Sequence, residues 1–128
     1  MFRAGEVVIA AFPFTSLTGV KRRPCVVLAA GDTPNDFVVA FITSVMATAN
    51  MPSATLISTT HPAWRQTGLK AASVVRADKL VTLNDSVISG AIGVLPADLL
   101  VTVRLKLKTL LQTPCASSPA VMQIAERS

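Results

Sequence analysis

Residues 24–44, PCVVLAAGDTPNDFVVAFITS, decide the fold class because they read as two strands joined by a tight turn. The run 24–30 begins with Pro24, and proline is tolerated at the first position of a strand because its missing N–H does least harm there. The segment 31–36, GDTPND, has the composition of a turn. The run 37–44 is apolar on both faces, which predicts a central, buried strand.

Similar β patterns flank this pair on both sides. Further strands are predicted over residues 6–12 (EVVIAAF), 54–58 (ATLIS), 72–83 (ASVVRADKLVTL) and 86–95 (SVISGAIGVL). The strands are short and separated by loops, with no internal repeat and no linker long enough to divide the chain. They predict a small, strongly bent β barrel.

A single helix is predicted over residues 96–112. Its apolar residues recur at helical spacing and include Leu99, Val103, Leu107 and Leu110. Pro96 fits the first helical position, and Pro114 ends the helix. The chain is therefore predicted to be mainly β with a C-terminal helix, as one domain over residues 1–112, followed by a disordered tail over residues 113–128.

The composition is unusually apolar for a small domain. Of the 128 residues 51% are hydrophobic and only 15% are charged. The longest uncharged run, residues 37–64, is interrupted by polar residues and Pro52, so no membrane span is expected, and the N-terminus does not resemble a signal peptide. We expect an apolar homodimer interface to cover the surplus. Cys25 and Cys115 suggest no disulfide framework, so a cytoplasmic location is expected.

The net charge of +5 is concentrated in clusters. Residues 1–23 and 61–82 each hold four basic residues against one acidic residue, and residues 104–108 add three more basic residues. Clustered cations suit a polyanion such as nucleic acid, or an acidic partner. The alternative is a solvated basic face that serves solubility.

Several kinds of catalytic site are excluded by the residues present. His61 is the only histidine and precedes Pro62, so neither a metal site nor a Ser/His/Asp triad is expected. The phosphate-binding motifs G-x-G-x-x-G and G-x-x-x-x-G-K-[ST] are absent. Arginine, aspartate and hydroxyl groups remain. They would suffice for cleavage of RNA, whose own 2′-OH is the nucleophile, because that reaction needs a base, an acid and positive charge on the phosphate.

Four blocks resemble, in order, the successive blocks of the MazF/PemK toxin family. They are GEVVIAAFPFTSLTGVKRRPCVVL (5–28), FITS (41–44), TGLKAASVVRADKLVTL (67–83) and IGVLPADLLVTVRLKLKTLL (92–111). The resemblance implies an SH3-like barrel and a cytoplasmic homodimer. It also implies a sequence-specific, metal-independent endoribonuclease without a cofactor, which cleaves single-stranded RNA such as mRNA within a type II toxin–antitoxin module. An acidic antitoxin is the implied partner.

The resemblance also implies four catalytic residues: Arg23, Thr43, Arg76 and Asp78. Arg23 precedes a proline, which favours an extended backbone, and its guanidinium fork can grip a phosphate through two hydrogen bonds. Arg76 and Asp78 are two residues apart in a strand and so share one face, roughly 7 Å apart. Without the resemblance, this pair would read as a surface ion pair and Thr43 as an ordinary strand residue.

RNA-binding roles are predicted for five further residues: Thr15, Lys21, Arg22, Ser44 and Lys79. The three cations are interpreted as phosphate-positioning charges. The first loop departs from the family pattern, since it offers Thr15, Ser16 and Thr18 where many relatives have Glu or His.

Two other functions stay open at this stage. The chain could be a non-catalytic SH3-like module that binds nucleic acid or protein, because fold does not fix function. It could also poison a protein target such as DNA gyrase, as the related CcdB toxins do.

Overall fold

The computed structural model describes residues 2–12 and 21–114. Within them the strands are β1 (Glu6–Phe12), β2 (Lys21–Ala30), β3 (Asp36–Thr43), β4 (Ala54–Ile57), β5 (Ser73–Asn84) and β6 (Ile88–Val94), and the helix is α1 (Ala97–Gln112). Short 3₁₀ helices lie between them: η1 (Met46–Asn50), η2 (Trp64–Thr67) and η3 (Asp85–Val87). The prediction of a mainly β chain with a C-terminal helix is confirmed.

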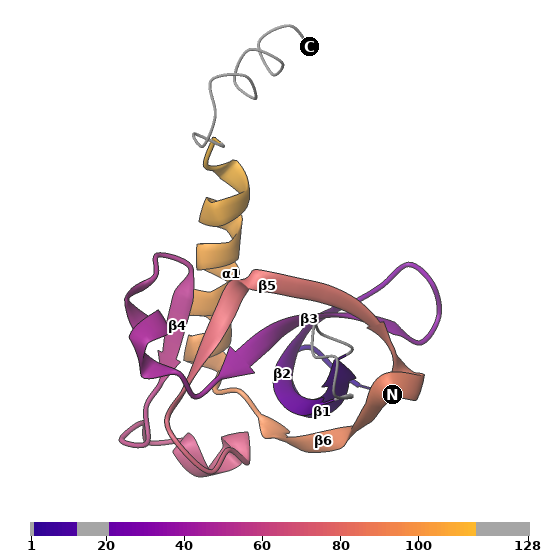
Figure 1. Ribbon diagram of the computed structural model, residues 1–128, viewed down its shortest axis with the longest axis horizontal. Helices are drawn as coiled ribbons and strands as arrows, with labels where there is room; N and C mark the ends of the chain where they lie inside the picture. Colours follow the sequence, from indigo (N-terminus) through magenta and orange to yellow (C-terminus); the bar gives the residue numbers. More distant parts are fainter. Residues whose placement is uncertain (1, 13–20, 115–128) are drawn as a thin grey trace, which may run out of the picture.

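The strands form one antiparallel sheet in the order β4-β5-β3-β2-β1-β6. The sheet curls strongly, so that β5 and β6 lie on either side of β1 and β2 (Figure 1). In the described residues β4 and β6 remain edge strands, and the sheet is not closed. The expected barrel is therefore not confirmed. The expected tail lies outside the described residues from residue 115 onward, as does Cys115.

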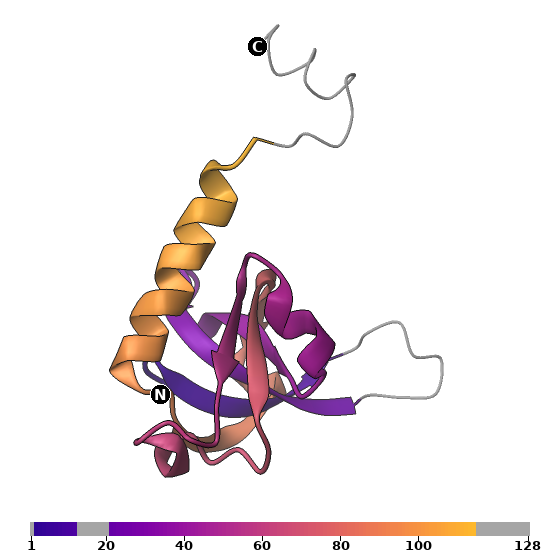
Figure 2. The ribbon, with the colours of Figure 1, turned by 90° about the vertical axis from the view of Figure 1, so that its left-hand side faces the viewer.

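One face of the sheet packs against α1, which stands beside it (Figure 2). The buried cluster on this face contains Val7, Val26, Leu28, Ala40, Ile42, Ile57, Val75, Leu95 and Val103, with Leu99, Leu100 and Leu107 of the helix packed against it. Leu99, Val103 and Leu107 of the predicted apolar stripe thus lie on the buried side of the helix, whereas Leu110 is exposed. No helix among the described residues is both long and apolar enough to cross a membrane.

The other face forms a second core inside the curl of the sheet. Its buried residues are Val8, Ala10, Cys25, Val27, Phe37, Val39, Leu83 and Ile88. Because successive strand residues point to opposite faces, a strand buried on both sides must be apolar throughout, as predicted for 37–44. Cys25 is fully buried, as expected, and burial raises the pKa of its thiol to about 12. That thiol is protonated and unreactive at neutral pH.

The predicted boundaries at Pro24 and Pro96 are wrong, and several other strand ends differ from the prediction by one or two residues. The strand expected to begin at Pro24 begins at Lys21, because β1 continues to pair with the three cations, up to Phe12 opposite Lys21. The cations therefore lie in β2 and not in the loop before it. Pro96 precedes the helix and is not its first residue, since its ψ of 143° is extended.

β5 departs from regular pairing in its middle. Ala40 of β3 lies opposite Leu80, whereas the next residue, Phe41, lies opposite Arg76. Residues 77–79 are therefore inserted between the two paired halves of β5. Such a bulge bends a strand and redirects its side chains, and here it contains Asp78.

Candidate active site

Arg23 and Thr43 come together at one end of neighbouring strands. Cys25 pairs with Phe41 in the antiparallel register of β2 and β3, so continuing that register sets Arg23 opposite Thr43. Both residues line a cavity of about 510 Å³. The Oγ1 of Thr43 accepts a hydrogen bond of 3.2 Å from the backbone N–H of Val45. This bond fixes the hydroxyl oxygen and leaves its proton available to another acceptor.

Arg76 lies on the next strand of the sheet, near the same end. It pairs with Phe41, while Thr43 pairs with Val74. Arg76 and Thr43 are therefore diagonal neighbours on one face, roughly 7–8 Å apart. The register thus brings three of the four residues predicted to be catalytic to one end of β2, β3 and β5.

Asp78 forms a two-pronged ion pair with Arg76. Nε of Arg76 donates to Oδ1 of Asp78 at 2.8 Å, and Nη2 donates to Oδ2 at 2.7 Å. The Arg76 side chain is only 14% exposed, so this pair is better shielded than an ordinary surface pair. Its hydrogen bonds hold the pKa of Asp78 below its usual value and raise the pKa of Arg76. At neutral pH both groups are therefore charged.

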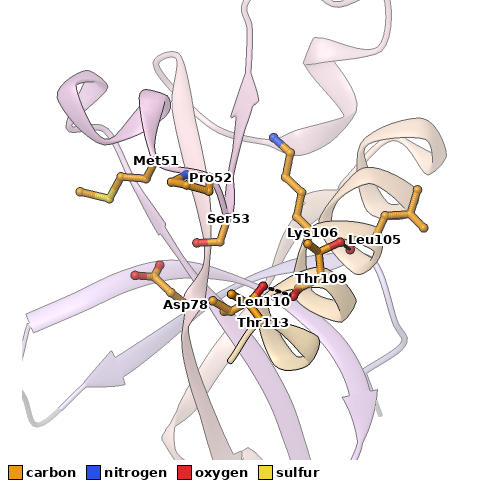
Figure 3. A pocket seen from close by; sticks show the side chains of 9 residues that line it. All are labelled: Met51, Pro52, Ser53, Asp78, Leu105, Lys106, Thr109, Leu110 and Thr113. Carbon is orange, nitrogen blue, oxygen red and sulfur yellow. Dashed lines mark hydrogen bonds between the residues drawn. The ribbon is translucent and has the colours of Figure 1, made fainter. Parts of the chain in front are cut away.

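Asp78 also faces a second cavity, which Arg23 and Thr43 do not line. This groove of about 500 Å³ runs between η1, the start of β4 and the C-terminal half of α1 (Figure 3). It is lined by Met51, Pro52, Ser53, Asp78, Leu105, Lys106, Thr109, Leu110 and Thr113. The Asp78 carboxylate thus lies at the boundary between the candidate site and the helix.

The residues predicted to bind RNA are placed unevenly around the site. Ser44 lines the same cavity as Arg23 and Thr43. Lys21, Arg22 and Lys79 are exposed. By strand alternation Lys21 shares the face of Arg23, while Arg22 lies on the other face of β2. Thr15 lies outside the described residues, as does the rest of the first loop.

One cation that lines this cavity was not among the predicted site residues. Lys70 lines the cavity together with Arg23, Thr43 and Ser44, although it is far from them in sequence. The remaining lining is Ile9, Pro24, Ile42, Gly68, Leu69, Ala71, Ser73 and Ile92. Lys70 belongs to the basic cluster 61–82, but only the folded chain shows which member of that cluster meets Arg23.

His61 has a structural role away from this cavity. Its Nε2 lies 2.9 Å from Oδ2 of Asp98 in the first turn of α1, and its Nδ1 accepts a hydrogen bond from the backbone N–H of Ala63. The His61 hydrogen bond lowers the pKa of Asp98. This contact ties the loop to the helix, in agreement with the interpretation of His61 as a loop residue. Among the described residues no group of His, Cys, Asp and Glu side chains could hold a metal ion.

Comparisons with known proteins connect this chain with one family. The model of a family described as PemK-like, MazF-like toxin of type II toxin–antitoxin system matches residues 3–111. A search of curated proteins found no match.

Among solved structures, the MazE–MazF complex of Deinococcus radiodurans (Form-III) is 29% identical. It aligns over 88% of this chain and 98% of that one, with a TM-score of 0.65. An endoribonuclease in complex with its cognate antitoxin, from a mycobacterial species, is 16% identical over 90% and 99% of the two chains, with a TM-score of 0.67. The toxin MazF-mt6 of Mycobacterium tuberculosis is 18% identical over 86% and 99%, with a TM-score of 0.65. The last two likenesses establish the fold alone.

Proposed function

The chain belongs to the PemK-like, MazF-like toxins of type II toxin–antitoxin systems, and we propose that it is a metal-independent endoribonuclease that cleaves single-stranded RNA. The proposal rests on the register of β2, β3 and β5. This register brings Arg23, Thr43 and Arg76 to one end of the sheet, with the Asp78 carboxylate bound to Arg76.

In the proposed reaction the RNA supplies the nucleophile. The 2′-oxygen attacks the neighbouring phosphorus, the new P–O2′ bond forms, and the bond from phosphorus to the 5′-oxygen breaks. The products are a 2′,3′-cyclic phosphate and a free 5′-hydroxyl. The step adds negative charge to the phosphate oxygens, so donors aimed at those oxygens lower the barrier most.

Arg23 and Thr43 are proposed to donate hydrogen bonds to the phosphate oxygens that gain this charge. The guanidinium of Arg23 can spread two hydrogen bonds over the phosphate, which a lysine cannot do. The fixed hydroxyl of Thr43 can donate a further bond, because Val45 engages its oxygen and not its proton. The scissile phosphate would then lie between β2 and β3, over the cavity that both residues line.

Asp78 is proposed to move the proton. Its lowered pKa keeps it ionised, so it can accept the proton of the 2′-OH. The departing 5′-oxygen lies on the opposite side of the phosphorus and takes its proton from water, while Asp78 returns its own proton to the solvent. Arg76 is a poor proton donor because its own pKa is raised. We assign Arg76 to orienting the carboxylate and adding positive charge to the site.

The partners are proposed on the same basis. Three side chains on α1, Val101, Leu105 and Leu111, are 55%, 58% and 73% exposed, which suits a homodimer interface. A strictly monomeric mass in light scattering at micromolar concentration would argue against the homodimer.

An acidic antitoxin segment would bind across Arg23 and Arg76, helped by charge complementarity. The expected place of action is the cytoplasm.

Incubation of the purified protein with several long RNAs in EDTA tests the proposal. Fragments with defined ends are expected. Intact RNA in every case would refute the nuclease and favour a binding module or a poison of a protein target. Cleavage that disappears with EDTA would contradict the metal-independent mechanism.

A further inference from the structure

The cavity beside Arg23 contains a second cation from a distant part of the chain. Lys70 and Arg23 both line it, above apolar side chains that include Ile42, Leu69 and Ile92. Among the described residues no carboxylate lines this cavity, and neither cation has a hydrogen bond or ion pair there. Two uncompensated positive charges at one apolar cavity repel each other until an anion joins them.

The backbone on either side of Lys70 is firmly held. Gly68 and Gly93 allow the loop to touch β6: a Cβ on Gly68 would lie 2.1 Å from the carbonyl oxygen of Ile92, and one on Gly93 would lie 2.3 Å from that of Gln66. Gly68 also has a φ of +71°, which favours glycine. The loop before Lys70 is therefore docked against the edge of the sheet.

Side-chain hydrogen bonds fix the residues next to Lys70. The fully buried Oγ1 of Thr67 donates to the carbonyl of Trp64 and accepts from the N–H of Leu69. On the other side, Oγ of Ser73 donates to the carbonyl of Ala71 at 2.9 Å. These contacts thus hold the backbone next to Lys70 in place, which lowers the entropic cost of binding a ligand there.

We infer that Lys70 is a phosphate-positioning residue of the RNA site. It holds the phosphate next to the one that Arg23 contacts, and the base of the nucleotide between these two phosphates lies over the apolar floor. An apolar floor beneath two cations fits a nucleotide better than an inorganic anion, because the base covers the floor while the phosphates neutralise the charges. This inference rests on the proposed function. Lys70 is assigned to substrate binding and takes no part in the proton transfer.

The test compares Lys70→Ala and Lys70→Arg with wild type, and uses Arg3→Ala as the control because Arg3 is an exposed cation that does not line this cavity. The probe for binding is a 2′-O-methyl RNA, which cannot supply the nucleophile, titrated at several salt concentrations. The probe for turnover is the unmodified RNA of the same sequence.

Lys70→Ala is expected to raise Kd and KM about tenfold, while kcat changes less than about twofold. The slope of log K against log salt should become shallower by about 0.7, the value for one lost single-strand phosphate contact. Lys70→Arg should retain most of the binding, and Arg3→Ala should match wild type. A purely structural role for Lys70 would not change the salt slope.

A Lys70→Ala protein with unchanged Kd and salt slope would overturn the inference, as would a fall in kcat at constant KM. If wild type fails to cleave the unmodified RNA, the proposed function fails. The 2′-O-methyl titration then still decides whether Lys70 contacts phosphate.

Discussion

Arg23 illustrates at the scale of a single residue how a side chain's geometry, beyond its charge, supports the proposed chemistry. It lies on β2 beside Thr43 and lines the cavity with Lys70. A lysine there would keep the charge but lose the fork that spans two phosphate oxygens. Arg22, one residue earlier, points to the other face of the strand. The two adjacent arginines should therefore respond very differently to the same substitution.

Arg23→Lys is predicted to fold and bind RNA but to cleave it at least about 100-fold more slowly, because a transition-state hydrogen bond is lost. Single-turnover rates measure this, and Arg22→Lys is the control expected to be nearly silent. Normal cleavage by Arg23→Lys together with an inactive Arg22→Lys would show that the neighbouring arginine is the functional one.

The ion pair of Arg76 and Asp78 predicts a pH dependence. Arg76 holds the pKa of Asp78 below its ordinary value, so the carboxylate stays ionised as the pH falls past that value. Protonation of Asp78 should therefore not slow cleavage anywhere between about pH 5 and 8. The pair's stabilising effect on the fold should likewise be complete above about pH 4 and be lost only as the pH falls through the lowered pKa. A rate profile with an acid limb near pH 6–7 would assign the base to another group.

At the scale of elements, the contact between β6 and the loop after η2 positions Lys70. Gly93→Ala should destabilise the protein by about 1–3 kcal/mol, because the new methyl group would meet the backbone of Gln66 and Thr67 at 2.3 Å. Urea unfolding measures the change, with Ser89→Ala, an exposed position on the same strand, as the control. An unchanged urea midpoint for Gly93→Ala would mean that the loop is not docked on β6.

The same elements show what the sequence can and cannot predict. Hydrophobic periodicity predicts the strands around residues 24–44 and the helix with Val103 on its buried side, because both patterns are local. The start of β2 at Lys21 depends on its pairing with β1, and the bulge at Asp78 depends on its pairing with β3. Lys70 joins Arg23 only through the packing of its loop on β6. These features arise from long-range contacts, which local patterns do not contain.

At the scale of the whole molecule, one end of the sheet collects cations from segments far apart in the chain. Arg23 and Lys70 share a cavity, and Arg76 lies diagonal to Thr43 with its carboxylate partner. Two cations from distant segments, Arg23 and Lys70, thus share one cavity, a placement that suits a polyanion better than a basic face that serves solubility alone. This site is therefore expected to cleave RNA by using the 2′-OH of the substrate.

Mass spectrometry of the ends left on a long RNA after digestion in EDTA tests for cleavage through the 2′-OH. The 3′ ends of the fragments are predicted to carry a 2′,3′-cyclic phosphate or its hydrolysis product, and the 5′ ends a hydroxyl. A DNA of the same sequence, which lacks the 2′-OH, should remain intact. Fragments with 3′-hydroxyl and 5′-phosphate ends would show that water is the nucleophile and would refute cleavage through the 2′-OH.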